Sequence, residues 1–225
     1  MTSKPNRISH ITRGDKNYPA RLNELYDPPA CLYLSGDVGL LHKPMIAIVG
    51  SRNASTQGLK NAQSFAKAIS TAGAVVVSGL AKGVDGAAHR ATLHLGAYTL
   101  AVCGTGLDIA YPKEHQGLAA AISKEGLLVS EFPPGVGPKA FHFPRRNRII
   151  AALSLGVVVI QAAQRSGSLI TAYLAAELGR EIFALPGPID DPLFAGCHQL
   201  IQQGAKLVCH PKEVLEELNF PKNPL

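Results

Sequence analysis

The stretch IAIVGSRNASTQGLKNAQSFAKAISTAGAVVVSG, residues 46–79, decides the fold. It opens on an apolar, β-branched run at 46–50, continues through a helical segment at 57–72 and closes on a second such run at 75–79. A strand that is apolar throughout, and not only at alternate residues, is typical of a sheet covered on both faces. The stretch therefore predicts two parallel strands joined by one helix.

The same alternation extends in both directions along the chain. Further apolar runs stand at 98–103, 127–132, 156–161, 181–187 and 206–210, an edge strand is expected at 31–35, and further helical segments stand at 85–94, 144–155, 168–178 and 211–218. This pattern predicts one α/β domain over residues 18–218, a doubly wound, mostly parallel and extended Rossmann-like sheet with helices on both faces. The polar residues 1–17 are expected to form a flexible N-terminal arm. Residues 219–225, with two prolines, are expected to form a linker toward a further C-terminal domain.

Composition favours a cytoplasmic protein with an anionic partner. The net charge is +6 and the isoelectric point is near 9.2. The four cysteines form no C-x-x-C pair and stand in or beside apolar segments, so we expect reduced thiols and no metal site. The first 20 residues lack the apolar core of a signal peptide, and no apolar run approaches the about 20 residues of a membrane span.

Acidic residues are absent from two long segments, between Asp37 and Asp85 and between Glu131 and Glu177. These segments hold ten of the 22 cations: Lys43, Arg52, Lys60, Lys67, Lys82, Lys139, Arg145, Arg146, Arg148 and Arg165. A surface that needs only solubility mixes both signs, whereas a surface that holds a polyanion leaves acids out. Buried strands and helices explain part of the absence, but they do not explain why cations remain in the loops.

Ligands of a doubly wound sheet bind outside the carboxyl ends of its strands. The segments that follow the predicted strands are rich in Gly and Ser, as in GSRNAS (50–55), SGLAKG (78–83) and AAQRSGSLIT (162–171). Exposed amides at helix starts bind phosphate, and Arg52, Lys82, Lys113 and Lys139 add positive charge at the same edge. The alternative is that each Gly and Ser is only a turn or cap residue.

Familiar nucleotide signatures are absent. The chain has no G-x-x-x-x-G-K-[ST] motif, and GSRN (50–53) replaces the G-x-G-x-x-G fingerprint of dinucleotide binding. Asp85 and His89, four residues apart at a helix start, are interpreted as a cap with a local hydrogen bond. No catalytic residue, metal or cofactor is therefore expected. Ser168 and Thr171 are expected to offer hydroxyls and a helix start to a phosphate.

The segment KAFHFPRRNR, residues 139–148, combines four cations with two phenylalanines and no acid. Cations that neutralise phosphates and rings that stack on bases are the requirements of single-stranded nucleic acid binding. The alternative is that Phe141 and Phe143 anchor the segment in the core and that some arginines form internal ion pairs.

Six ordered blocks carry a resemblance to a known family. They are IVGSRNAS (48–55), SGLAKGVDGAAH (78–89), AVCGTGLDIAYP (101–112), SEFPPG (130–135), FPRRNRIIAALS (143–154) and SGSLITA (166–172). Together they resemble the Rossmann-type domain of the DNA-processing proteins called DprA or Smf, over roughly residues 18–210. The resemblance implies a single-stranded DNA-binding protein, not an enzyme. Such a protein protects incoming DNA in natural transformation, loads RecA recombinase onto it and works as a homodimer.

The resemblance also implies roles for residues. Arg52 is the implied phosphate contact, with Lys113 and the 139–148 segment around it. The full set expected to bind DNA is Ser51, Arg52, Ser55, Gly79, Lys82, Gly104, Lys113, Lys139, Phe141, Phe143, Arg145, Arg146, Asn147, Arg148, Ser168 and Thr171. This chain departs from the family at Gln161, where a glutamate is usual. The winged-helix-like module that is frequent in the family would follow Leu225.

An enzyme is the alternative hypothesis. The same fold resembles the nucleotide-processing phosphoribohydrolases of the lysine-decarboxylase-like group, which need a P-G-G-x-G-T-x-x-E loop with a catalytic Glu. The corresponding stretch here is SGSLITA (166–172), and the nearest acid is Glu177. The absence of a Glu within the loop disfavours this alternative.

Overall fold

The computed structural model describes residues 8–220, and within them nine strands form one sheet in the order β1-β2-β6-β5-β4-β3-β7-β8-β9. The strands are β1 (Ser9–Thr12), β2 (Cys31–Gly36), β3 (Met45–Val49), β4 (Val75–Ser78), β5 (Thr99–Cys103), β6 (Leu127–Ser130), β7 (Gly156–Val159), β8 (Glu181–Ala184) and β9 (Lys206–Leu207). Strands β3 to β9 run parallel to one another, and β1 and β2 are antiparallel. The predicted doubly wound, mostly parallel sheet is confirmed.

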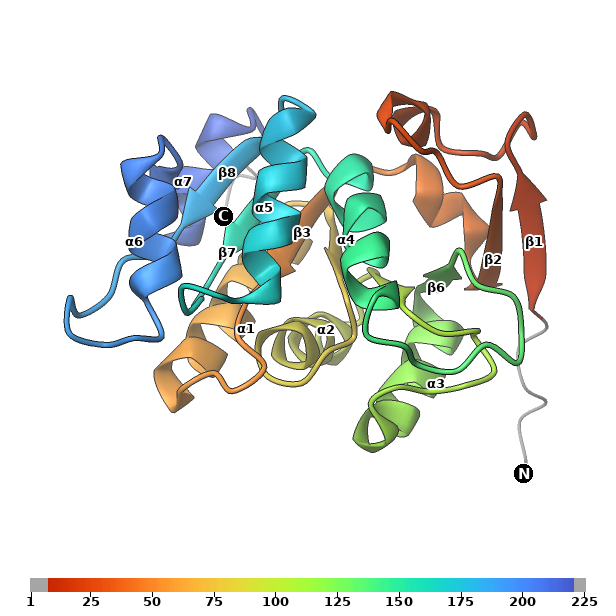
Figure 1. The fold of residues 1–225 in the computed structure, drawn as a ribbon, viewed down its shortest axis with the longest axis horizontal. Helices are drawn as coiled ribbons and strands as arrows, with labels where there is room; N and C mark the ends of the chain where they lie inside the picture. The colour runs from red at the N-terminus through yellow and green to blue at the C-terminus, as the bar shows by residue number, and fades with distance from the viewer. Residues whose placement is uncertain (1–7, 221–225) are drawn as a thin grey trace.

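Helices cover both faces of this sheet (Figure 1). They are α1 (Thr56–Thr71), α2 (Val84–His94), α3 (Gln116–Glu125), α4 (His142–Leu153), α5 (Gly167–Glu177), α6 (Ala195–Gln202) and α7 (Pro211–Glu217), and three 3-10 turns are η1 (Ala20–Glu24), η2 (Val38–His42) and η3 (Lys113–His115). Apolar side chains of α4, α5 and α6 pack on one face, and those of α1, α2 and α7 pack on the other. Side chains of α3 pack on β5 and β6.

Strand β3 shows why the central strands are apolar at every residue. All five of its residues are buried. Ile46 and Ile48 point toward α1 and α2, while Ala47 and Val49 join the cluster under α4 and α5. Successive side chains of a strand point to opposite faces, so a strand covered on both sides has no polar position.

The chain changes direction across the sheet at β3. From β3 the chain proceeds through α1 to β4 on one side, and it returns much later to place β7 on the other side. The loops after β3 and β7 therefore diverge, α1 and α5 begin on opposite faces, and a crevice opens between them. Such a switch point is where ligands bind in doubly wound folds.

The N-terminal boundary differs from the sequence prediction. Residues 9–12, expected to belong to a flexible arm, form β1 and pair in register with β2. Ile11 is buried in the main core, and the Asp15 carboxylate accepts hydrogen bonds from the Thr12 amide and hydroxyl. These tertiary contacts hold a segment whose own sequence is polar. Residues 1–7 of the expected arm lie outside the described residues.

At the other end, Phe220 packs against the cluster beneath α1 and α7, so the folded unit extends two residues past 218. Residues 221–225 of the expected linker lie outside the described residues. Within residues 8–220, no helix has the length and apolarity needed to cross a membrane.

Candidate functional site

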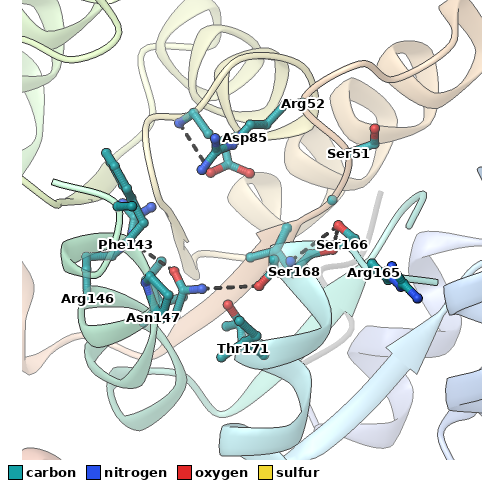
Figure 2. Close-up of a pocket in the computed structure, with 18 of the residues that line it drawn as sticks. Ser51, Arg52, Asp85, Phe143, Arg146, Asn147, Arg165, Ser166, Ser168 and Thr171 are labelled. Carbon is teal, nitrogen blue, oxygen red and sulfur yellow. Dashed lines mark hydrogen bonds between the residues drawn. The ribbon is translucent and has the colours of Figure 1, made fainter. Parts of the chain in front are cut away.

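A cavity of about 760 Å³ opens at the carboxyl ends of β3 and β7 (Figure 2). Phe143, Arg146 and Asn147 project into it from α4, Ser168 and Thr171 come from α5, and Ser51 and Arg52 come from the loop after β3. Lys139 also lines it. Eight of the residues predicted from sequence therefore meet around one cavity.

The loop after β3 packs closely against its neighbours and carries Arg52 at the rim of the cavity. A Cβ on Gly50 would lie 2.7 Å from the Val84 side chain and 2.9 Å from the Gln161 carbonyl oxygen. The Ser51 amide donates to that same carbonyl at 2.7 Å. No side chain fits at residue 50, and the exposed Arg52 is left at the rim of the cavity.

The start of α5 forms the opposite wall. Ser166 caps the helix, and its hydroxyl lies 2.7 Å from that of Ser168. The Asn147 side-chain amide donates to the Gly167 carbonyl at 3.2 Å, which ties α4 to this turn. The exposed Arg165 precedes it. The first amides of a helix carry partial positive charge, so this wall attracts an anion.

Two aromatic rings stand between these walls. The rings of Phe143 and Tyr111 have centroids 5.3 Å apart, tilted by 36°. The Arg52 guanidinium lies 5.5 Å from the Phe143 centroid, within the range of a cation–π interaction. A Cβ on Gly104 would lie 2.9 Å from Phe143, so a glycine is required for the ring to sit there. Gly104 thus supports the site by permitting close packing.

Phe141 lies apart from the cavity. Its side chain is 63% exposed, the Lys139 ammonium lies 5.9 Å from its ring, and the ring meets His142 edge-on at 4.6 Å. It is not a core anchor, so the alternative considered for it from sequence is wrong. Phe143 is half-buried and lines the cavity, so it agrees in part with the stacking interpretation and in part with the core-anchor interpretation.

Arg146 is held inside the protein, although the sequence suggested a DNA contact. It is 4% exposed, and its Nη1 donates to the carbonyl of Gly79 at 2.5 Å and to that of Val102. Its Nε donates to the Asn147 side-chain oxygen at 3.1 Å. A Cβ on Gly79 would lie 2.5 Å from the guanidinium, so Gly79 also serves this packing. Arg146 therefore joins the ends of β4 and β5 to α4.

Asp85 is the buried counterpart of Arg146. It is 6% exposed, and its carboxylate accepts from the amides of Gly79 at 3.1 Å and Ala81 at 3.3 Å. Burial raises the pKa of Asp85, and the charge of Arg146 opposes that rise. The carboxylate fixes the loop before α2, not the first amides of the helix, which corrects the predicted cap.

His89 does not bond to Asp85, as the sequence had suggested. Its Nδ1 lies 2.7 Å from the Thr99 hydroxyl, which itself donates to the Val76 carbonyl at 2.8 Å. Because the Thr99 hydroxyl donates its proton to Val76, His89 Nδ1 must donate to the Thr99 oxygen. Burial, aided by the neighbouring His115 and by the charges of Arg146 and Arg90, lowers the pKa of His89 to about 3. His89 is a neutral core residue.

Two arginines of the 139–148 segment form internal ion pairs, as the alternative interpretation allowed. Arg145 donates to both carboxylate oxygens of Glu131, at 2.9 and 3.1 Å, and Arg148 donates to the same carboxylate at 2.5 Å. Neither lines the cavity. The structure places them at the junction of α4 with the end of β6, outside the lining of the cavity.

The remaining predicted residues lie beside the cavity. Lys82 pairs with Glu114 at 2.6 Å and lines a smaller hollow with Gly79. Lys113 is exposed in η3 and does not line the cavity. Ser55 caps α1, accepting from the Gly58 amide at 3.1 Å.

Gln161 has a structural role at the end of β7. Its side-chain oxygen accepts from the Ser55 amide at 2.8 Å, and its amide donates to the Ser55 hydroxyl at 3.1 Å. These two bonds fix the start of α1 to β7. Gln161 is fully buried and does not line the cavity.

The lining residues that the sequence prediction missed include Asn53, Tyr111, Arg165 and Ser166. Arg165 carried a signal, because it stands in an acid-free segment and in the loop after a predicted strand. Tyr111 carried none, since a single tyrosine in a Gly-rich loop is not distinguishable from a surface residue.

Comparison with known proteins gives a consistent result. The family model described as DNA recombination-mediator protein A matches residues 9–219. The DNA processing protein DprA of Streptococcus pneumoniae is 50% identical over 206 residues, which are 92% of this chain and 73% of that protein. Protein Smf of Escherichia coli is 48% identical over 94% of this chain, which spans 57% of that protein.

Solved structures agree with this result. The X-ray structure of the S. pneumoniae protein superposes with a TM-score of 0.91 at 48% identity, covering 96% of this chain and 76% of that one. DNA processing protein A from Helicobacter pylori, described for its single-stranded DNA binding mode, gives 0.86 at 30% identity. That comparison covers 96% of this chain and 98% of the other.

We predict that Arg146→Met lowers the free energy of unfolding by about 3–5 kcal/mol, because it leaves Asp85 buried beside no positive charge and two carbonyls without their donor. Urea denaturation measures the change. Arg52→Met is the matched control, since Arg52 is exposed, and should change stability by less than about 0.5 kcal/mol. Adding Asp85→Asn to Arg146→Met should recover part of the loss. Equal stability of the Arg146 and Arg52 variants would contradict the assignment.

Proposed function

Because the chain belongs to the DNA recombination-mediator protein A family, we propose that it binds single-stranded DNA in the cavity between β3 and β7. One observation carries the proposal: exposed cations and two aromatic rings surround a cavity whose lining has no exposed carboxylate among the residues described. The relative from H. pylori described for single-stranded DNA binding supports it.

The phosphates are bound by cations at the rim and by the start of α5. Arg52, Lys139 and Arg165 are exposed and line the cavity from three different segments. Within the described part of the chain, none of the three has a carboxylate within 4.0 Å. Their charges remain available to the backbone of the strand, whose binding releases counterions.

The bases stack on the aromatic wall. Tyr111 is 41% exposed and lines the cavity next to Phe143. Base–aromatic stacking needs an unpaired base, because a base inside a duplex is already stacked on its neighbours. The cavity is lined by the loop after β3 and by residues of α4 and α5, so a bound strand would lie between these elements. These features favour single strands and little sequence preference.

The wider role rests on the resemblance to the family. We propose that the protein is cytoplasmic, works as a homodimer, protects incoming DNA in natural transformation and loads RecA recombinase onto it. These are properties that the family resemblance implies, and the cavity is compatible with the first step, which is holding the strand.

The enzyme alternative is weaker. Among the described residues, the carboxylate that lines the cavity is that of Asp85, which is buried and hydrogen-bonded to two amides. Glu177 is the last residue of α5, about 15 Å along the helix from the cavity end. We therefore propose that the protein is not a phosphoribohydrolase. Release of free base from nucleoside monophosphates would overturn this proposal.

We expect the protein to bind a single-stranded oligonucleotide more tightly than a duplex of equal length at the same salt. A salt-series binding assay measures both. Arg52→Ala should weaken binding to all sequences and reduce the salt slope by about 0.7, the value of one phosphate contact on a single strand. Arg52→Glu should weaken it further, because it places an acid at an acid-free rim. Equal or tighter duplex binding, or wild-type affinity in a folded Arg52→Glu protein, would show that the cavity is not the site.

We expect Tyr111→Ala and Phe143→Ala each to weaken binding by about 1–3 kcal/mol, and the loss should persist at high salt because stacking is not screened. Lys139→Ala should lose its effect as salt rises. Phe141→Ala, which removes an exposed ring outside the cavity, is the control. Thermal unfolding is measured in parallel. If Tyr111→Ala or Phe143→Ala lowers the melting temperature but leaves binding unchanged, that ring has a packing role and the stacking assignment is wrong.

A further inference from the structure

The surface formed by α1 and α2 contains no exposed acid. Between residues 38 and 107 the sequence has one acidic residue, Asp85, and that residue is buried. The same range has six cations: Lys43, Arg52, Lys60, Lys67, Lys82 and Arg90. In the fold this range forms the continuous unit from β3 to β5, with α1 and α2 packed against each other on one face of the sheet.

Helix α1 leads away from the cavity. It begins at Thr56, directly after the loop that carries Arg52 and Asn53 at the rim. Lys60 and Lys67 are exposed and seven residues apart, so they lie on one side of the helix, the second about 16 Å from the helix start. On α2, Arg90 is exposed about two turns from its start.

These three cations differ from the cations of α3, α7, β9 and the turn before β8. Lys124, Lys206, Lys212 and Arg180 each have a carboxylate partner nearby. Within residues 8–220, Lys60, Lys67 and Arg90 have no carboxylate within 4.0 Å. A Glu four residues from a Lys stabilises an exposed helix, and α1 has none. A face that only needed solubility would mix both signs, so a polyanion better explains this one.

The flanking helices limit where a polyanion can lie. Helix α7, which packs beside α1, carries Glu213, Glu216 and Glu217. Helix α3, which packs beside α2, carries Glu125 and is preceded by Glu114 in η3. The acid-free strip is therefore bounded on both sides by acids, and it opens toward the cavity at the Arg52 loop.

We propose that a single DNA strand held in the cavity continues past Arg52 along this α1–α2 strip, where Lys60, Lys67 and Arg90 neutralise its phosphates. This inference rests on the proposed function. It assigns to the protein a second, base-independent contact area that short oligonucleotides do not reach. Affinity should therefore rise with strand length beyond what fills the cavity.

The test compares oligothymidylates of about five and about fifteen nucleotides, within the range of site sizes known for single-strand grooves, on the whole 225-residue chain. For the longer strand, Lys60→Gln with Lys67→Gln should reduce the salt slope by about 1.4, and Arg90→Gln by a further 0.7 or so. The short strand should bind these variants as it binds the wild type.

Lys124→Gln with Lys212→Gln is the matched control, since it removes the same charge from lysines that have acidic partners, and it should change neither strand. Equal weakening of both lengths by the Lys60 and Lys67 variant, or no weakening of the longer strand, overturns the inference and leaves the cavity assignment intact. A wild-type protein that binds neither strand at low salt overturns the proposed function as well.

Discussion

The burial of one guanidinium holds the candidate site together. Arg146 bonds to the carbonyl of Gly79, directly after β4, and to that of Val102 in β5. Asp85 holds the loop after β4 through two amides. A charge in a protein interior is tolerated only when it is paired and hydrogen-bonded. These bonds fix the ends of β4 and β5, the start of α2 and the start of α4 relative to one another. The positions of Phe143 and Asn147 on α4 are fixed with them.

This arrangement divides the cations into two groups. Arg145, Arg146 and Arg148 satisfy protein carboxylates and carbonyls, whereas Arg52, Lys139 and Arg165 remain exposed at the rim of the cavity. The first group holds α4 in place and the second is free to bind a ligand. The distinction matters for experiments, because loss of binding in a variant of the first group reports folding as much as contact.

Much of the fold could be predicted from the pattern of apolar residues. Buried parallel strands are apolar at every residue, and this sequence has seven such runs. The position of the cavity followed from the rule that ligands bind at strand ends. The sequence could not show in which direction each side chain points. The cations of 139–148 look equivalent in a linear reading, but on α4 the three-residue spacing of Arg145 and Arg148 turns both toward Glu131, while Phe143, Arg146 and Asn147 face the cavity. Strand β1 was missed because only the tertiary pairing with β2 holds its polar residues in place.

The central claim is that the cavity between β3 and β7, and not another face, holds the bases of a single strand. Photocrosslinking with a short oligonucleotide that carries 5-bromouracil, followed by peptide mapping, tests this claim most directly. We expect crosslinks to the peptides that contain Tyr111 and Phe143, and their loss in the presence of excess unlabelled strand. Crosslinks confined to α6, β9 and α7, near the β9 edge of the sheet, would contradict it.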